Sequence, residues 1–172
     1  YVLNTMVRLV APILSFTSEE IWQTHPSLKE QNESIFLSKY IDAKQTGDCS
    51  ISSSDWVRIF EIKDLVNQSI EKLRNENMLK GSLDSNVIIT ADSSDKLILD
   101  KLGSELHFVF ISSHASVIEG GSLSIQIDQV DYKKCSRCWH RDASVGQSQE
   151  HPEICFRCEE NIGEIGESRS FV

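Results

Sequence analysis

Four cysteines in the last quarter of the chain have the spacing of a metal site. They form two pairs, Cys135-Ser-Arg-Cys138 and Cys155-Phe-Arg-Cys158, which are separated by sixteen residues. Each CxxC turn can present two thiolates, and two such turns can close a tetrahedron around zinc with Zn–S bonds of about 2.3 Å. The pattern therefore predicts one structural Zn²⁺, bound by Cys135, Cys138, Cys155 and Cys158.

Two disulfide bonds, or a pair of redox-active CxxC sites, are the alternatives for these cysteines. Disulfides need an oxidising compartment, and a redox CxxC usually stands alone at the start of a helix, so zinc is favoured over both. Cys49 lies far away in a polar stretch and is predicted to be a free thiol. Since four cysteines complete a closed site, His140 is not expected to bind the metal, and the site is not expected to be catalytic.

The segment around the first cysteine pair combines positive charge with an aromatic side chain. The sequence KKCSRCWHR contains Lys133, Lys134, Arg137 and Arg141 but no acidic residue, although the whole chain has a formal net charge of −9. That net charge argues against bulk attraction to nucleic acid, so the segment favours a focused contact with a polyanion. Trp139, on a turn fixed by metal, can stack on an unpaired base while the basic residues meet phosphates. The alternative is that Trp139 covers the zinc site as a hydrophobic lid.

The composition predicts a soluble chain built from two or three small units. No run of eighteen or more apolar residues occurs among the 172, so no membrane span is predicted. The first residue, Tyr1, enters an apolar periodic stretch that has no helix start signal. This beginning indicates an internal fragment of a longer protein, in which a targeting signal would not be visible.

The N-terminal region is predicted to be helical. Apolar residues at helical spacing predict one helix before Pro12 and a second helix after it. The sequence TSEE at residues 17–20 has the pattern of a capping box, in which Thr17 would be the N-cap of the second helix.

A long helix is predicted in the middle of the chain, after a polar loop at residues 45–54. Ser54 or Asp55 would cap this helix, Trp56 would lie on its core-facing side, and Gly81 would follow its end.

Beyond Gly81 the apolar periodicity changes to that of short strands. Three strands are predicted, at residues 87–90, 107–111 and 123–127. Between the first and second strands a helix is predicted, which Ser94 or Asp95 would cap and which would end near Leu102. Strand, helix, strand, strand is the order of a small α+β unit with one helix on one face of the sheet.

Several segments resemble one family of proteins. LVAPILSFTSEEIWQ looks like the helical anticodon-binding domain that isoleucyl, valyl, leucyl and methionyl class I aminoacyl-tRNA synthetases share. KGSLDSNVIIT and LGSELHFVFISSHASV are similar to the segment that follows this domain in bacterial isoleucyl-tRNA synthetases. KCSRCWH with the second CxxC resembles the C-terminal zinc module of the isoleucyl enzymes, which separates them from the others. The resemblance runs in order over nearly the whole chain.

This resemblance implies the C-terminal part of an isoleucyl-tRNA synthetase, with an α+β fold in three parts. Residues 1–80 would be the C-terminal part of the helical anticodon-binding domain, and residues 81–130 a small mixed α/β unit. Residues 131–172 would form the four-cysteine zinc-ribbon or knuckle module.

The family uses ATP to attach isoleucine to its tRNA and hydrolyses mischarged valine. Its HIGH-like and KMSKS-like ATP-binding motifs do not occur in this sequence, nor does its editing domain. The resemblance therefore carries over no catalytic or ATP-binding residue, and the chain alone is expected to be inactive as a ligase. It implies two partners, the anticodon region of isoleucine-specific tRNA and the rest of the parent synthetase, in the cytoplasm or in an organellar matrix.

Two other interpretations remain open at the level of sequence. The zinc finger of formamidopyrimidine-type DNA glycosylases has a similar spacing of two knuckles and would make this module a probe of duplex DNA. That interpretation leaves LVAPILSFTSEEIWQ and the long helix unexplained, and the chain begins with Tyr1 rather than a catalytic N-terminal amine. A third possibility is a purely structural zinc module that only docks on its parent.

Overall fold

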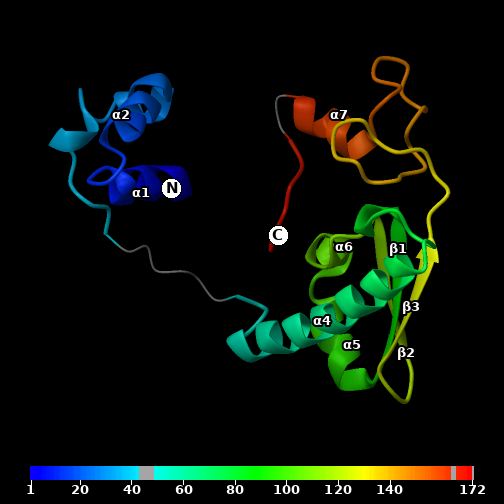
Figure 1. The fold of residues 1–172 in the computed structure, drawn as a ribbon. Helices are drawn as coiled ribbons and strands as arrows, with labels where there is room; N and C mark the ends of the chain where they lie inside the picture. Colours follow the sequence, from blue (N-terminus) through cyan, green and yellow to red (C-terminus); the bar gives the residue numbers. More distant parts are fainter. Residues whose placement is uncertain (43–48, 164–165, 172) are drawn as a thin grey trace. The chain divides into compact units, whose positions relative to one another are not determined.

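The computed structural model describes residues 1–42, 49–163 and 166–171. The chain forms two compact units, Tyr1–Asp48 and Cys49–Val172. The first unit is helical, and the second contains a three-stranded sheet, several helices and the cysteine pairs (Figure 1). None of the helices in the described ranges is both long and apolar enough to cross a lipid bilayer.

The first unit contains the helices predicted on either side of Pro12. They are α1 (Val2–Val10) and α2 (Ser15–Thr24), followed by α3 (Pro26–Lys29) and the short 3₁₀ helix η1 (Ile35–Leu37). Its small core surrounds the fully buried ring of Trp22, whose indole N–H donates to the Asn32 carbonyl oxygen at 2.9 Å. By contrast, Phe16 is 93% exposed and Ile13 is 82% exposed.

The predicted capping box at residues 17–20 is wrong. Helix α2 begins at Ser15, so Thr17 lies inside its first turn. The Ser15 hydroxyl donates to the Ala11 carbonyl oxygen at 3.1 Å, which ties the start of α2 to the end of α1. The neighbouring Glu19 carboxylate accepts hydrogen bonds from Ser34 and Ile35, which are distant in sequence.

The long helix of the second unit is α4 (Ser53–Asn75). Ser52 is its N-cap, and a capping box joins Ser52 to Asp55, so the helix begins slightly before the predicted position. Part of the predicted loop at residues 45–54 lies outside the described residues, and its end belongs to α4. The buried side chains of α4 recur at helical spacing and pack towards the sheet: Ile59, Ile62, Val66 and Ile70.

The sheet has the order β2-β1-β3. Its strands are β1 (Ser85–Ala91), β2 (His114–Glu119) and β3 (Ser124–Gln129). Strand β1 pairs in parallel with β2 and antiparallel with β3, and its alternate residues are buried. A parallel pair needs a crossover connection. Here it consists of α5 (Ser93–Asp100), η3 (Gly103–Glu105) and α6 (Leu106–Phe110).

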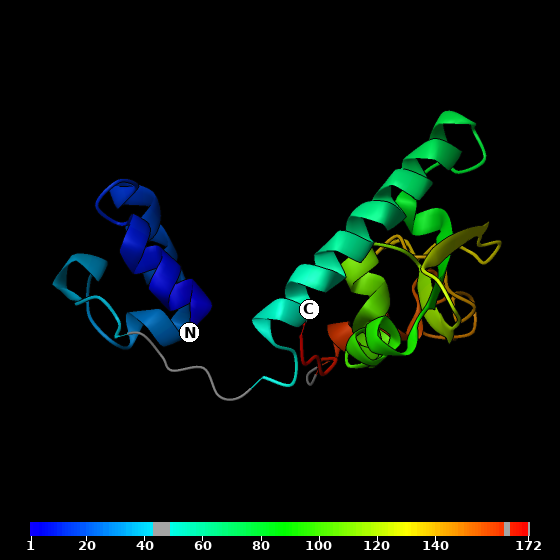
Figure 2. The same cartoon turned by 90° about the horizontal axis from the view of Figure 1, so that it is seen from below.

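Helices α4, α5 and α6 lie together on one face of this sheet (Figures 1 and 2). The predicted division at residues 80/81 placed α4 with the N-terminal helices, whereas its contacts are with β3, α5 and α6. Because the apolar side of α4 completes the core over the sheet, the helix belongs to the same compact unit as the strands.

The predicted strand at residues 107–111 is wrong, since Leu106–Phe110 form α6 and the second strand is β2. Aromatic and β-branched residues favour a strand on composition alone. In the structure Leu106, Val109 and Phe110 are buried, which is the i, i+3, i+4 spacing of one helix face. Ile111 then ends the helix in the left-handed region, at φ 54°.

This backbone conformation at Ile111 makes a prediction about stability. The left-handed region is strained for a β-branched residue but not for glycine. Because the Ile111 side chain is 52% exposed, its removal exposes little additional apolar surface. We expect Ile111→Gly to raise the free energy of unfolding by up to about 1 kcal/mol. Urea unfolding of the zinc-loaded protein measures this; a decrease larger than about 1 kcal/mol would show that side-chain contacts dominate here.

Candidate metal centre

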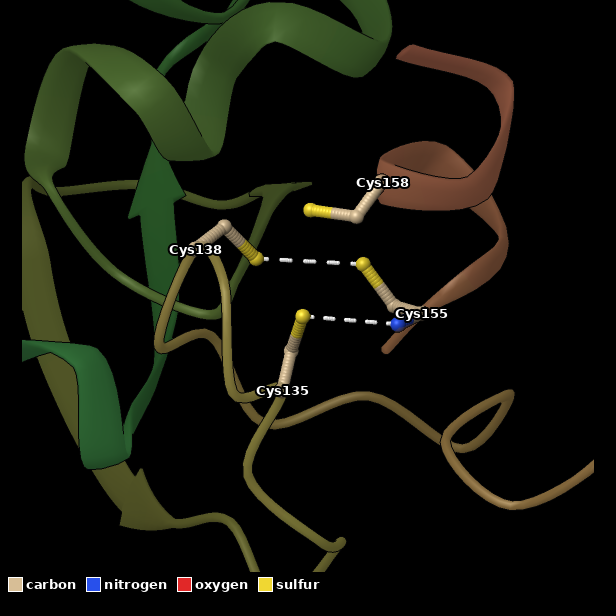
Figure 3. A group of neighbouring side chains, drawn as sticks. All are labelled: Cys135, Cys138, Cys155 and Cys158. Carbon is tan, nitrogen blue, oxygen red and sulfur yellow. Dashed lines mark hydrogen bonds between the residues drawn. The ribbon is translucent and has the colours of Figure 1, made fainter. Parts of the chain in front are cut away.

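The four predicted ligands lie together in the structure (Figure 3). The sulfur atoms of Cys135, Cys138, Cys155 and Cys158 are all within 4.8 Å of one another. A tetrahedral site with Zn–S bonds of about 2.3 Å has S···S edges of about 3.8 Å. The Cys138 and Cys155 sulfurs are 3.8 Å apart, which fits a shared metal and is far longer than a disulfide bond. Cys49 is exposed and takes no part.

The first pair is held by a tight turn that closes on itself. Lys134 and Arg141 form an isolated antiparallel bridge on either side of it. Inside this bridge the Cys135 N–H donates to the His140 carbonyl oxygen at 2.9 Å, and the Trp139 N–H donates to the Cys135 carbonyl oxygen at 3.0 Å. Both thiols of the pair are thereby aimed to the same side of the turn (Figure 3).

The second pair stands at the start of helix α7 (Phe156–Ile162). Cys155 occupies the N-cap position, and Cys158 points from the first turn towards the other sulfurs (Figure 3). The Cys155 N–H lies 3.4 Å from the Cys135 sulfur, so backbone of the second turn already contacts a thiol of the first. A helix N-terminus favours negative charge, as a thiolate ligand requires.

Burial and hydrogen bonding act on these thiols in opposite directions. Burial alone would raise the pKa of Cys135, but backbone hydrogen bonds from Cys138, Cys155 and Arg137 lower that pKa to about 6. Burial raises the pKa of Cys155 and of Cys158. Two of the thiols therefore hold protons at neutral pH that a metal must displace, and metal affinity falls with decreasing pH.

The module has almost no apolar core apart from the cysteines. In the described residues, its buried cluster adds only Val145 and the partly buried Ile154 to the four sulfurs. Such a cluster cannot offset the conformational entropy of the surrounding loops, so the chemistry of four converging thiols points to a structural metal as the main stabilising element.

Trp139 is not part of this cluster. Its side chain is 59% exposed, and its backbone is in the left-handed region at φ 69°. The Lys134 amino group lies 5.0 Å from the centre of its ring. The structure therefore presents an exposed aromatic face next to positive charge. Lys133, which precedes Lys134 in the sequence, is also exposed.

The two predicted arginines of this segment have partners inside the protein. Arg141 forms an ion pair with Asp84, and its guanidinium also donates to the Tyr132 carbonyl oxygen at 2.9 Å. The Arg141 N–H donates to the Ser113 hydroxyl at 2.7 Å, so this residue joins the cysteine module to the sheet. Arg137 donates to the Cys158 sulfur at 3.6 Å.

His140 lies between the module and helix α6. Its Nδ1 is 3.3 Å from the Cys138 carbonyl oxygen, and its ring makes edge contacts with His107 and Phe108. Burial lowers the pKa of His140 and lowers that of His107 to about 4, so both imidazoles are neutral at physiological pH. His140 packs beside the cysteine cluster and is not one of its four ligand residues.

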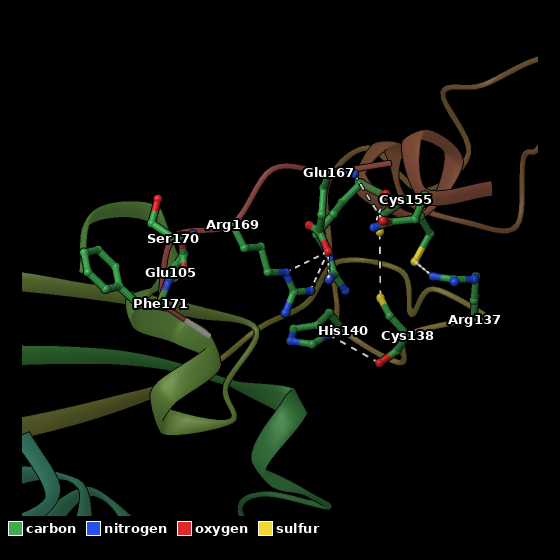
Figure 4. A network of polar contacts seen from close by, with 12 residues as sticks. Glu105, Arg137, Cys138, His140, Cys155, Glu167, Arg169, Ser170 and Phe171 are labelled. Atoms are coloured by element: carbon green, nitrogen blue, oxygen red, sulfur yellow. Dashed lines mark hydrogen bonds and ion pairs between the residues drawn. The ribbon is translucent and has the colours of Figure 1, made fainter. Parts of the chain in front are cut away.

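Sequence reasoning missed a second connection, formed by the C-terminal strap, residues 166–171. Buried Glu105 accepts hydrogen bonds from the Ser170 and Phe171 N–H groups at 2.6 and 2.8 Å (Figure 4). Glu167 pairs with Arg157 of α7 and with Arg169. No local pattern marks these contacts, because they join residues up to 66 positions apart.

Two family models match separate parts of the chain. Residues 1–89 match the family described as the anticodon-binding domain of tRNA ligases. The chain belongs to this family. Residues 133–161 match the zinc finger found in FPG and IleRS, and with the four-cysteine cluster this supports a structural zinc.

Curated relatives are isoleucine–tRNA ligases. The chain is 41% identical to that of Francisella philomiragia, over 100% of the chain and 20% of the relative, and 38% identical to that of Dichelobacter nodosus, over 100% and 18%. Identity to that of Legionella pneumophila is 39%, over 95% and 18%. The chain spans about a fifth of the length of the curated relatives that it matches.

Proposed function

We propose that this chain is the tRNA-binding C-terminal part of an isoleucine–tRNA ligase. The observation that carries the proposal is the match of its whole length to relatives with that name, which includes both the helices and the zinc finger. A DNA glycosylase would account for the zinc finger alone, because that family description covers both kinds of protein. The parent would be a cytoplasmic, ATP-dependent ligase, and this chain would supply recognition without catalysis.

Cys135, Cys138, Cys155 and Cys158 are proposed to bind one structural zinc. The sulfur distances support this ligand set, as does the small apolar cluster of the described residues, which adds only Val145 and Ile154 to the cysteines. When bound, zinc fixes the two turns relative to one another and stabilises the fold of the module.

The proposed tRNA contact is the face formed by Trp139 and the basic residues beside it. An exposed indole on a turn fixed by metal can stack on an unpaired anticodon-loop base, and the exposed Lys133 and Lys134 can meet the flanking phosphates. Arg137 and Arg141 belong to the predicted contact set as well. Their internal partners give them less freedom to reach a phosphate.

A further proposed partner is the rest of the parent enzyme. The N-terminal unit exposes large apolar side chains, and Phe16 and Ile13 are the most exposed of these. Such side chains are typical of a surface that packs against other protein.

The test is tRNA binding by zinc-loaded Trp139→Ala over a series of salt concentrations. Loss of base stacking should weaken binding by roughly 1 to 3 kcal/mol with little change in the salt dependence. Lys134→Ala should instead flatten the slope of log K against log [salt] by somewhat under one unit, because one phosphate contact is lost. Trp139→Phe, which keeps an aromatic face, should recover most of the affinity.

The same titrations with duplex DNA provide the comparison. Tighter binding of duplex DNA than of tRNA at equal salt would favour the glycosylase interpretation. Unchanged affinity and slope in both zinc-loaded variants would leave the module a structural appendage.

A further inference from the structure

The two cysteine turns share a feature beyond their ligands. In both, the residue immediately before the second cysteine is an arginine: Cys135-Ser-Arg-Cys138 and Cys155-Phe-Arg-Cys158. In the structure these arginines reach across to the opposite turn. Arg137 of the first turn donates to the sulfur of Cys158 in the second, at 3.6 Å (Figure 4). Arg157 of the second turn lies close enough to Cys138 of the first turn for that thiol to raise the pKa of its guanidinium.

This reciprocal arrangement matches the charge of a tetrathiolate zinc site. Four thiolates and one Zn²⁺ carry a net charge of −2. Arg137, Arg157 and Arg169 together with the Glu167 carboxylate that Arg157 and Arg169 share supply a net +2. Three of the sulfurs are buried, with Cys135 and Cys158 at 0% exposure, and a net charge away from water is costly unless it is paired. A guanidinium stays protonated under all ordinary conditions, so it can compensate thiolates but cannot deliver a proton to them.

Arg157 is held in position from three sides. Glu167 of the C-terminal strap pairs with its guanidinium at 3.2 Å, and the ring of Phe108 lies 4.9 Å beneath it. The Cys138 thiol is the third neighbour, and it raises the pKa of this guanidinium. The strap is itself anchored by Glu105, so a chain of contacts runs from the core of the sheet to a thiol of the metal site (Figure 4).

Arg137 has a simpler environment. Its side chain is exposed, and its bond to Cys158 is the first cause of the raised pKa of this guanidinium. Solvent screens an exposed pair more strongly than a buried one. Burial opposes the charge on Arg157, yet its bonds to Cys138 and Glu167 keep its pKa raised as well.

We propose that Arg137 and Arg157 act as a reciprocal pair that neutralises the zinc tetrathiolate, each compensating a thiolate of the opposite turn, and that zinc retention depends on them. The inference rests on the proposed zinc ligands but not on tRNA binding. Outer-shell partners of this kind tune the donor strength and the lifetime of metal ligands. Both are positioning residues, since neither contacts the metal.

The test is the rate at which the zinc-loaded protein transfers its metal to a chromogenic chelator. Arg157→Gln should release zinc roughly ten-fold faster, within the range seen for loss of outer-shell partners, and Arg137→Gln should show a smaller acceleration because it is exposed. Arg157→Lys and Arg137→Lys keep the charge and should recover part of the retention. Arg141→Gln is the matched control, because it removes a guanidinium of the same module that pairs with Asp84 rather than with a sulfur.

A spectroscopic measurement separates this role from general stabilisation. In the Co²⁺-substituted protein, a hydrogen bond to a thiolate lowers the energy of the sulfur lone pair, so its removal should shift the sulfur-to-cobalt charge-transfer band to longer wavelength. Zinc release and band position unchanged in both glutamine variants would overturn the proposal, as would equal acceleration by Arg141→Gln. A wild-type protein that holds no zinc would overturn the ligand assignment as well, whereas bound zinc that is indifferent to both arginines would overturn this inference alone.

Discussion

Removal of zinc is expected to unfold the cysteine module, residues 133–163, while the sheet and its helices stay folded. Zinc binding to modules of this kind supplies about 10 to 16 kcal/mol of folding free energy. Among the residues that the structure describes, the apolar cluster of the module adds only Val145 and Ile154 to the cysteines. The sheet has its own core, in which α4, α5 and α6 cover β1 without any contribution from the metal. Hydrogen exchange of chelated protein should therefore show loss of protection in the module and retention in β1.

Two cysteine substitutions make this prediction specific. Cys155→Ser removes a ligand and should reproduce the effect of the chelator, with less than one zinc per chain by metal analysis. Cys49→Ser removes the exposed thiol outside the cluster and should keep full zinc content and full protection. Full zinc content in Cys155→Ser would contradict the ligand assignment. Joint loss of protection in module and sheet would show that contacts such as Arg141 to Asp84 make them one cooperative unit.

The features that could be predicted from the sequence are those with a local physical cause. The cysteine spacing predicts the cluster because two CxxC turns place four sulfurs within reach of one ion. Helix α4 carries a long apolar period and its own capping box, both contained in neighbouring residues. Helix α5 is predicted too, but the predicted cap is wrong: the N-cap is Asp92, whose side chain accepts from the N–H groups of Ser94 and Asp95.

The features that could not be predicted depend on distant contacts. Residues 107–111 have the composition of a strand, but the burial of Phe110 in the core between the helices and the sheet selects a helical turn. Strand β2 has no clear alternation of burial, because its outer face is open, and its pairing with β1 decides its conformation.

The roles of the basic residues show the same limit within the site. The sequence assigns Lys133, Lys134, Arg137 and Arg141 to one charged segment. In three dimensions Arg141 pairs with Asp84, which is 57 positions away, and Arg137 meets Cys158, which is 21 positions away. Charge composition predicts that a segment can attract a polyanion, but only the fold determines which of its charges already have partners.

Phe110→Ala is expected to cost about 3 to 5 kcal/mol of unfolding free energy in the second unit. The ring of Phe110 is fully buried, at 0% exposure, in the core between α6, α4 and the sheet. Its truncation removes apolar surface from the core and leaves a cavity that a close-packed sheet and helix cannot fill by small movements. A domain with typical stability would lose a large part of its total free energy of folding.

Phe60→Ala is the matched control, since it removes the same atoms from a residue of α4 that is 52% exposed. It should change the free energy by less than about 1 kcal/mol. Hydrogen exchange of the β1 amides in zinc-loaded protein gives the opening free energy of this unit separately from Tyr1–Asp48. Equal effects of the two substitutions would contradict the placement of α6 in the core. Loss of zinc from Phe110→Ala under native conditions would show instead that Phe108 and His140, packed next to one another, transmit the disturbance to the metal site.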